Sequence, residues 1–353
     1  MMLDFALIIE DKYIETFIRW ESRTLRAAVF SEPDKPLLIK DVEKPSIGPD
    51  EMLLQVSYCG VCGTDIHASR EGPFKAPKGT VFGHEFVGRI VEIGIDLKNS
   101  NFSIGDRVTS LPFIGSKTIG LGAITGAYSQ FVKVGHDLVV KIPDQMTDIE
   151  AVLVEPLAVG LHATKMAGQI SEKNILIIGA GPIGLACAIW CNFFGARSVV
   201  ISERSPTRIE KAKELGFHDV IDPSTNTVEA FMIATGGEPE IQFDCVGAPG
   251  IMQECIERAP KKGLVMGIGV CDQPDTITPL IAFSKELRIQ WAVAYEKADF
   301  EFTIGMIKSK RINATKMVTN IISLEELPSI FQQLQNPSEQ CKVLIDLSKN
   351  SSQ

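Results

Sequence analysis

The chain has 353 residues, of which 45% are hydrophobic, and its formal net charge is -9 at pH 7. This length is long for a single domain and predicts two, each with enough apolar residues for a core. The acidic charge argues against a nucleic acid or an anionic membrane as a partner. We predict no membrane-spanning helix.

Residues 1–23 precede the first predicted strand. This N-terminal extension starts with acidic residues and has no small-residue cleavage site, which argues against a signal peptide. It is either an added helix or a translation-start artefact, and its apolar residues fall roughly on one helical face: Phe5, Ile8, Ile9, Ile14, Phe17 and Ile18. The eight cysteines of the chain lie mostly far apart, which favours buried thiols in a reducing cytoplasm over a disulfide framework.

The section from about residue 24 to residue 160 is rich in predicted strands and loops. Short apolar runs bounded by Pro and Gly predict strands at 25–30 and 52–56, and similar runs follow at 88–94 and 106–109. Residues 111–128 are rich in Gly, Ser and Thr and predict a long loop. We therefore expect a first domain that is mainly β.

The pattern changes near Ser171, where strands begin to alternate with helices. The predicted strands are 174–178, 198–202, 241–244 and 264–266. Ser205 and Pro206 start a helix that ends at Gly216. Such alternation predicts a parallel sheet covered by helices. A helix at 300–308 and a strand at 341–347 then return to the first domain, so we expect domains of 24–160 with 298–353, and 161–297.

A glycine-rich run directly follows the strand at 174–178 and opens a helix. The run is Gly179-Ala180-Gly181-Pro182-Ile183-Gly184, in which the glycines let backbone N–H groups approach a pyrophosphate at the helix N-terminus. Pro182 is tolerated there because a first-turn residue has no N–H partner to lose. In this context the run predicts a dinucleotide site.

The end of the second strand of that unit indicates which dinucleotide binds. Glu203 stands where a carboxylate accepts the ribose hydroxyls of NAD and repels the extra phosphate of NADP. Arg204 and Arg208 argue in the other direction, since guanidinium groups bind phosphate, unless they form a solvated helix face. We predict NAD in preference to NADP.

Side chains that bind metals occur at three separated places in the chain: Cys62, then His84 and Glu85, and much later Glu155. A thiolate, an imidazole and a carboxylate are ligand types that zinc accepts, and three protein ligands with one open position make a catalytic site. The residues therefore predict catalytic rather than structural zinc.

The order of these motifs resembles the zinc-dependent medium-chain dehydrogenase/reductase family. The run from Cys62 to His67, the Gly83-His84-Glu85 run, the Glu155-Pro156 pair and the glycine-rich run all match it, and Glu155 is most similar to the branch with sorbitol, butanediol and threonine dehydrogenases. The resemblance covers about residues 25–347. It implies a GroES-like catalytic domain joined to a Rossmann domain, an α/β architecture with zinc between the domains.

Carried over residue by residue, the resemblance assigns roles to the metal set. Cys62 and His84 are zinc ligands, and either Glu85 or Glu155 is the third. Asp65 accepts the ring N–H of His84, or it is simply a loop-capping carboxylate.

The resemblance also assigns a proton relay and a cofactor contact. Thr64 passes the substrate proton, through a ribose hydroxyl of the cofactor, to His67 and solvent. Lys342 either lies near the cofactor pyrophosphate or is a solvated lysine at a strand edge.

Two departures from the family pattern refine these predictions. No cysteine occurs between Cys62 and Cys187, so a second zinc held by four cysteines is excluded and we predict one zinc ion per subunit. Ala68 replaces an aromatic residue of polyol-oxidising relatives, and their sugar-binding arginine has no match at 294–296. A smaller or more apolar secondary alcohol is therefore as good a candidate as a sugar alcohol.

The sequence thus predicts a cytoplasmic alcohol dehydrogenase that transfers a hydride between an alcohol or carbonyl and NAD(P). The alternatives are a zinc-free quinone or enoyl reductase and a nucleotide-binding family member without catalysis. We expect a small-molecule substrate and a homodimer or homotetramer, with the apolar stretch 287–293 near the subunit interface.

Overall fold

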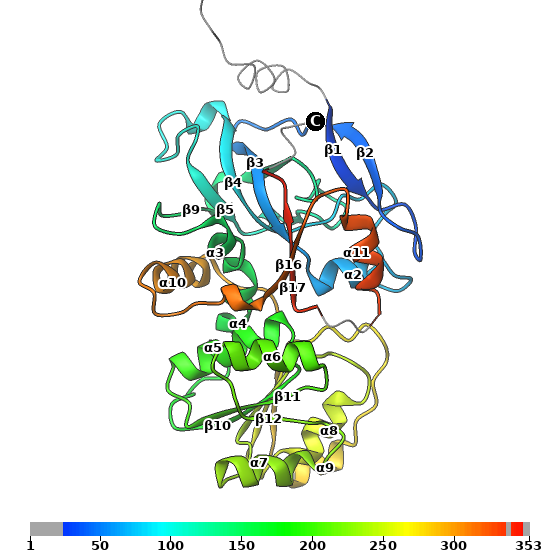
Figure 1. Ribbon diagram of the computed structural model, residues 1–353, viewed down its shortest axis with the longest axis vertical. Helices are drawn as coiled ribbons and strands as arrows, with labels where there is room; N and C mark the ends of the chain where they lie inside the picture. Colours follow the sequence, from blue (N-terminus) through cyan, green and yellow to red (C-terminus); the bar gives the residue numbers. More distant parts are fainter. Residues whose placement is uncertain (1–23, 337–339, 349–353) are drawn as a thin grey trace, which may run out of the picture.

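A computed structural model describes residues 24–336 and 340–348, and it shows two lobes stacked along the long axis of the molecule (Figure 1). The upper lobe contains the first part of the chain together with its red C-terminal end, and the lower lobe contains the green and yellow middle part. The predicted extension at residues 1–23 lies outside the described residues. Within them, no helix is long and apolar enough to cross a membrane, and the uncharged run 174–196 is divided between a strand and a helix.

The upper lobe is organised around a seven-stranded sheet. The order is β16-β17-β3-β4-β5-β9, and β8 pairs with β3. The strands are β3 (Glu51–Gly60), β4 (Glu85–Ile93), β5 (Arg107–Ser110), β8 (Phe131–Gly135), β9 (Val139–Lys141), β16 (Val318–Ile322) and β17 (Lys342–Asp346). The last two bring the C-terminal part of the chain into the same sheet as β3 and β4.

Smaller elements complete the upper lobe. The antiparallel pair β1 (Thr24–Val29) and β2 (Leu38–Glu43) flanks the sheet, and helices α2 (Gly63–Ala68), α3 (Asp148–Val152) and α11 (Leu327–Gln333) connect or cover strands. The predicted loop at 111–128 contains a small hairpin, β6 (Phe113–Ile114) with β7 (Lys117–Thr118). The prediction of an uninterrupted loop was wrong, because Gly115 takes a positive φ of 58° and turns the chain between two very short strands.

The lower lobe contains a six-stranded sheet in which every pairing is parallel, in the order β12-β11-β10-β13-β14-β15. Helices cover it, as a parallel sheet requires. The strands are β10 (Asn174–Ile178), β11 (Ser198–Ser202), β12 (Val220–Ile221), β13 (Ile241–Asp244), β14 (Leu264–Gly267) and β15 (Arg288–Trp291), and the helices are α5 (Pro182–Phe193), α6 (Pro206–Glu214), α7 (Thr227–Thr235), α8 (Ile251–Arg258) and α9 (Pro279–Ser284). A β domain joined to a Rossmann-type sheet confirms the predicted fold class.

Local sequence explains why these elements begin and end where they do. All five residues of β10 are buried, as expected for a central strand of a parallel sheet. The Ser205 hydroxyl accepts from the N–H of Arg208 and caps α6, and Pro206 occupies the first turn. The chain leaves that helix at Gly216, which has a φ of 94°.

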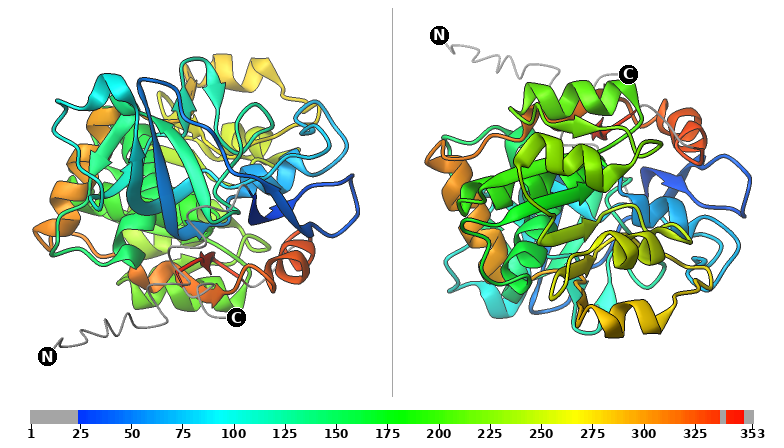
Figure 2. Two further views of the ribbon diagram at one scale, coloured as in Figure 1. Left: turned by 90° about the horizontal axis from the view of Figure 1, so that it is seen from above. Right: turned by 90° about the horizontal axis from the view of Figure 1, so that it is seen from below.

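A long helix, α4 (Val154–Met166), joins the lobes and packs against both α5 and α10 (Lys297–Lys308). Gly160 allows α4 to approach α5 closely, because an added Cβ would lie 2.7 Å from the Cβ of Ala186. The domain boundary predicted after residue 160 falls inside this helix. Helix α10 lies on the opposite side of the molecule from α11 in the views along the long axis (Figure 2).

Candidate metal centre and cofactor loop

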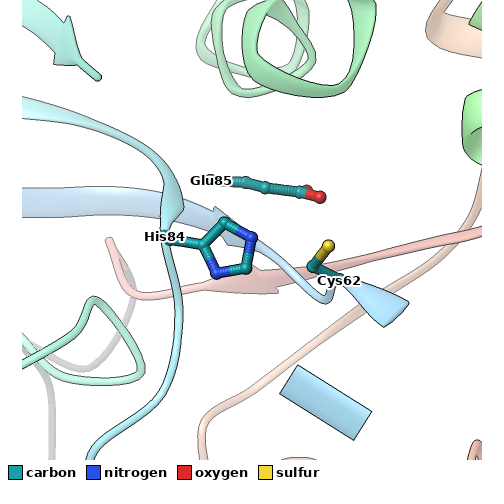
Figure 3. A group of neighbouring side chains, drawn as sticks. All are labelled: Cys62, His84 and Glu85. Atoms are coloured by element: carbon teal, nitrogen blue, oxygen red, sulfur yellow. The ribbon is translucent and has the colours of Figure 1, made fainter. Parts of the chain in front are cut away.

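Three potential metal ligands meet at the end of the upper lobe nearer the Rossmann sheet. Ligand atoms of Cys62, His84 and Glu85 all lie within 4.8 Å of one another (Figure 3). Strand pairing brings them together: Gly60, at the end of β3, is opposite Glu85, at the start of β4, and Cys62 follows as the N-cap of α2. We call these three residues the metal cluster.

Asp65 orients the histidine of the metal cluster. Its Oδ1 lies 3.2 Å from His84 Nδ1, and its Oδ2 accepts a hydrogen bond of 2.7 Å from the Tyr128 hydroxyl. The same carboxylate accepts from the Cys62 N–H in the capping box of α2. The two roles considered for Asp65 are therefore compatible, and the Nδ1 contact leaves Nε2 of His84 available for a metal.

The charges around His84 favour a cation at this position. Burial acts to lower the pKa of His84, but the charges of Asp65 and Cys62 and hydrogen bonds to both raise it well above its ordinary value. A site that stabilises a protonated imidazole so strongly carries excess negative charge. Zinc would supply positive charge, and sulfur, nitrogen and oxygen donors suit it, so the residues fit the predicted metal.

Lys342 lies beside the metal cluster. Its Nζ donates to both carboxylate oxygens of Glu85 at 2.7 Å and to the carbonyl oxygen of Val61 at 3.1 Å. Burial acts to lower the pKa of Lys342, but Glu85 and Cys62 raise it above its ordinary value. Both side chains of this ion pair are almost completely buried.

The prediction of a solvated lysine at a strand edge was therefore wrong. Strand β17 lies between β16 and β3 rather than at an edge, and all five of its residues are buried. The Lys342 ammonium contacts Glu85, and the alternative position near the cofactor pyrophosphate stays a prediction.

Glu155 belongs to the first turn of α4 and lies outside the group of described ligand atoms that forms the metal cluster. Its Oε1 accepts a hydrogen bond of 2.6 Å from the Tyr295 hydroxyl. Burial and the charge of Glu85 raise the pKa of Glu155 to about 7, while His84, Tyr295 and Lys342 act in the opposite direction. Glu155 is thus a carboxyl group that can exchange a proton near neutral pH.

Thr64 and His67 lie one turn apart on α2, directly after Cys62. The N–H of Thr64 donates to the Cys62 sulfur at 3.4 Å, and both side chains are partly exposed. His67 Nδ1 lies 3.7 Å from Oδ2 of Asp272, a residue of the lower lobe. The predicted relay residues therefore follow Cys62 on one short helix, and His67 approaches the lower lobe.

The glycine-rich run, residues 179–184, lies between β10 and α5 as predicted, and we call it the glycine loop. Pro182 is the first residue of α5 and Ile183 the second. A Cβ at Gly184 would lie 1.8 Å from the carbonyl oxygen of Gly179, so this position requires glycine for the turn itself. A Cβ at Gly181 would meet no described atom within 4 Å, which leaves its outer side open to a ligand.

Glu203 lies beside the glycine loop, where the sequence places the residue that contacts ribose. Its Oε2 accepts from the Ala180 N–H at 2.8 Å, and its Oε1 accepts from the N–H groups of Arg204 and Ser205. The Arg208 side chain lies 4.0 Å from Glu203 and donates to the Gln340 carbonyl oxygen at 3.1 Å. The side chain of Arg204 is exposed.

Comparison with known proteins identifies the family. Residues 48–144 match the family described as alcohol dehydrogenase GroES-like domain, and residues 182–309 match the family described as zinc-binding dehydrogenase. Sorbitol dehydrogenase of Homo sapiens is 30% identical over 320 residues, which cover 84% of this chain and 89% of that protein. The chain belongs to the zinc-binding alcohol dehydrogenase family. It is therefore an NAD(P)-dependent oxidoreductase that acts on CH–OH groups.

Other relatives show the same similarity over nearly the whole chain. (R,R)-Butanediol dehydrogenase of Bacillus subtilis is 28% identical over 338 residues, 88% of this chain and 96% of that protein. The crystal structure of 2R,3R-butanediol dehydrogenase from Bacillus subtilis superposes with a TM-score of 0.82, covering 91% of this chain and 99% of that one. A putative zinc-binding dehydrogenase from Sinorhizobium meliloti bound to NADP is 26% identical with a TM-score of 0.83, covering 92% of this chain and 100% of that one.

The sequence did not predict three contacts of the site. Tyr295 reaches Glu155, Tyr128 reaches Asp65 and Asp272 approaches His67, and each pair is far apart in the chain. Tyr295 belongs to the stretch where the arginine of polyol-oxidising relatives has no match. No local pattern marks the other two, because only the folded chain brings them to the site.

Proposed function

We propose that the protein is a zinc-dependent dehydrogenase that transfers a hydride between a secondary alcohol, or its carbonyl form, and NAD. The observation that carries this proposal is the metal cluster itself. A thiol, an imidazole and a carboxylate from separate parts of the chain lie within 4.8 Å of one another. A set of three protein ligands leaves a fourth position for a substrate oxygen, as catalytic zinc sites do.

Within this proposal Cys62, His84 and Glu85 hold the metal, and Asp65 fixes the ring of His84. Glu85 is preferred as the third ligand because its oxygen lies with the other two donors, whereas Glu155 lies outside this group of described ligand atoms. Zinc, when bound, supplies a Lewis acid that polarises the substrate oxygen and acidifies an alcohol. Lys342 holds Glu85 in place by binding both of its oxygens.

Two glutamine variants distinguish the carboxylates. Glu85→Gln should lower the zinc content of the purified protein, since an amide is a weaker donor than a carboxylate. Glu155→Gln should keep the metal and lower turnover. The assignment is reversed if Glu155→Gln loses zinc and Glu85→Gln retains it, and elemental analysis of both proteins decides between them.

The proton released on alcohol oxidation leaves by way of α2. The Thr64 hydroxyl can accept and donate a proton, and the His67 imidazole can do so through its two ring nitrogens. The two residues lie three positions apart on α2 and so share a face of the helix, and both side chains are partly exposed. Together they give a substrate at the metal cluster a proton exit.

The glycine loop and Glu203 support NAD as the cofactor. The open side of Gly181 lets a pyrophosphate approach the N-terminus of α5. Three backbone N–H groups hold the Glu203 carboxylate beside this loop, where it favours ribose hydroxyls over a ribose phosphate. Arg208 is engaged by Gln340 and Glu203, so it is a poor candidate for binding that phosphate.

The substrate proposed is a small secondary alcohol or its ketone. The relatives that match most of the chain include butanediol and sorbitol dehydrogenases. Ala68 replaces an aromatic residue of polyol-oxidising relatives, and their sugar-binding arginine has no match at 294–296, so we expect fewer polar partners for several hydroxyl groups. A small diol or another small secondary alcohol is therefore proposed beside a six-carbon polyol as the substrate.

The subunits are proposed to pair through the exposed end of the lower sheet. In the part of the chain that the structure describes, β15 is an edge strand. Trp291, its last residue, and Val293, which follows shortly after, are both exposed. Leu280 and Phe283 of α9, the helix that precedes β15 in the chain, are also exposed. A self-complementary edge of this kind favours a homodimer, or a homotetramer built from dimers, and light scattering gives its mass.

Two further proposals concern metal count and compartment. The chain has no cysteine between Cys62 and Cys187, so a second zinc site of four cysteines cannot form there. We therefore expect one zinc ion per subunit. All eight cysteines are described and free, which supports a reducing compartment such as the cytoplasm.

The experiment that tests the function is a panel of alcohols and carbonyls with NAD(H) and NADP(H), read by nicotinamide absorbance. A secondary alcohol should give zinc-dependent reduction of NAD at a higher kcat/KM than of NADP. Turnover of quinones or enones by the metal-free protein would favour a zinc-free reductase. Cofactor binding without turnover of any compound would favour a non-catalytic family member.

A further inference from the structure

One loop of the lower lobe reaches the relay histidine of the upper lobe. Residues 268–278 join β14 to α9, and the yellow chain on the right of Figure 1 rises from the Rossmann lobe toward α2. Both ends of the loop are anchored in its own lobe. The N–H of Gly269 donates to the Asp244 carbonyl oxygen at 2.9 Å, and the N–H of Thr278 donates to the Gln253 side chain at 2.7 Å.

The middle of this loop places Asp272 beside His67. Asp272 Oδ2 lies 3.7 Å from His67 Nδ1, and the two side chains are 13% and 26% exposed. The other carboxylate oxygen accepts from the Gln273 side chain at 3.3 Å, which leaves Oδ2 toward the ring. The loop also lies over the end of α2, since a Cβ at Gly72 would be 3.7 Å from the same Oδ2.

His67 has a buried nitrogen that lacks a hydrogen bond. Nδ1 has essentially no solvent contact and no hydrogen-bond partner among the residues that the structure describes. A buried polar atom without a partner is unfavourable, and native proteins usually satisfy it. The Asp272 carboxylate is a few tenths of an ångström beyond hydrogen-bond distance, so it is the group placed to satisfy this nitrogen.

We propose that Asp272 is a positioning residue that acts through His67 to complete the proton exit. A carboxylate at Nδ1 keeps a proton on that nitrogen and leaves the lone pair on Nε2, which is the tautomer needed to accept a proton. When Nε2 takes the proton that passes Thr64, the ring becomes a cation and Asp272 balances its charge. The cation then returns one proton to bulk water, and no other bond changes.

The position of Asp272 also links the relay to the contact between the lobes. His67 belongs to the catalytic lobe and Asp272 to the cofactor-binding lobe, so their separation depends on how closely the lobes approach each other. If the relay is complete only when the two lobes are in contact, a proton leaves the site only when the cofactor-binding lobe is in place. This inference rests on the proposed dehydrogenase function, because it assigns the relay to alcohol oxidation.

The first test does not require activity. Imidazole ¹⁵N shifts of the full-length protein report the tautomer of His67, and His67→Asn assigns its signal. Asp272→Asn should increase the Nε2–H tautomer, which a free histidine side chain prefers, and Asp272→Glu should restore the Nδ1–H form. Glu71→Gln is the matched control, because it removes a carboxylate near α2 that pairs with Lys75 instead. An unchanged His67 signal in Asp272→Asn would overturn the proposal.

The second test is kinetic. Asp272→Asn should lower kcat about tenfold, less than the roughly 10²–10⁴-fold typical of a group that itself transfers the proton, because Asp272 acts only through the ring. KM for NAD should change less than about twofold. In a His67→Ala background the same change should have no further effect, because its action passes through the ring. An equal loss in both backgrounds would show a structural role only. If the wild type oxidises no alcohol, the proposed function fails, and the tautomer measurement still decides whether Asp272 controls His67.

Discussion

The metal cluster and the glycine loop lie in different lobes and are built by different means. The metal cluster gathers ligand side chains from two places in the chain, Cys62 and the adjacent His84 and Glu85, and Asp65 and Lys342 contact them. All of these except the partly exposed Cys62 are buried. The glycine loop is one continuous run whose function depends on backbone N–H groups and on the absence of side chains. Substitutions that remove a charged or metal-binding group should therefore disrupt the metal cluster. Substitutions that add side-chain atoms should disrupt the glycine loop.

The largest loss of zinc and of activity should follow from replacing the thiol of Cys62. Cys62→Ser should remove most of the bound zinc and lower kcat/KM at least about a thousandfold, because the Lewis acid is lost. Elemental analysis and the dehydrogenase assay measure the two effects. Cys59→Ser is the control, since Cys59 is the other half of a C-x-x-C but is buried outside the cluster. Equal loss of zinc in both variants would mean that the pair binds metal together.

The second prediction concerns the buried ion pair behind the cluster. Lys342→Met should reduce the free energy of unfolding of the metal-free protein by about 3–5 kcal/mol, because it leaves the Glu85 carboxylate buried without a cation. Denaturant titration of the chelator-treated protein measures this. Adding Glu85→Gln should recover part of the loss. A Lys342→Met protein as stable as the wild type would show that Glu85 is satisfied in another way.

Two alanine substitutions in the glycine loop separate folding from binding. Gly184→Ala should reduce stability by about 2–4 kcal/mol, because its Cβ overlaps the Gly179 carbonyl oxygen. Gly181→Ala should change stability by less than about 0.5 kcal/mol, since its Cβ meets no described atom.

Gly181→Ala should nevertheless weaken NAD binding, because the methyl group occupies the side open to the pyrophosphate. Thermal unfolding and cofactor titration together distinguish the two variants. Unchanged NAD affinity in Gly181→Ala would place the pyrophosphate elsewhere.

Among the substitutions that should destabilise the protein, the one with the smallest effect on the free energy of unfolding lies at the contact between α4 and α10. His162 and Lys165 of α4 both contact Asp299 of α10. Burial acts to raise the pKa of Asp299, but Lys165 and the Glu296 N–H lower it below its ordinary value of 3.8. Its stabilisation is thus present above about pH 4 and is lost as the pH falls through the lowered pKa.

Asp299→Asn should therefore cost about 1–2 kcal/mol at pH 7 and progressively less in acid. Denaturant titration at several pH values measures the difference between variant and wild type. A difference that stays constant down to pH 2 would show that charge at Asp299 is not the cause.

The same contrast explains what the sequence could predict. The positions of the glycine loop and of Glu203 in the fold could be predicted, because a strand, a tight turn and a helix N-terminus are local features of consecutive residues. The ligands of the metal cluster were predicted from two features: their side chains are of types that bind zinc, and the motifs around them resemble those of a known family. Their partners were not, because Tyr128, Tyr295 and Asp272 reach the site through contacts between distant elements.

Lys342 shows most clearly where sequence reasoning ends. A single lysine in an apolar strand is compatible with an edge position or with a buried ion pair, and only the strand order decides between them. Strand β17 lies between β16 and β3, its residues are all buried, and the Lys342 ammonium pairs with Glu85 of β4. The hairpin at 113–118 was missed for a related reason, since strands of two residues have no periodicity to detect.

The most direct test of the account is zinc K-edge X-ray absorption on the purified protein without substrate. The cluster of Cys62, His84 and Glu85 predicts one sulfur neighbour at about 2.3 Å and the remaining neighbours nitrogen or oxygen at about 2.0–2.2 Å. A shell of four sulfur atoms, or a fully active protein that holds no zinc, would contradict it.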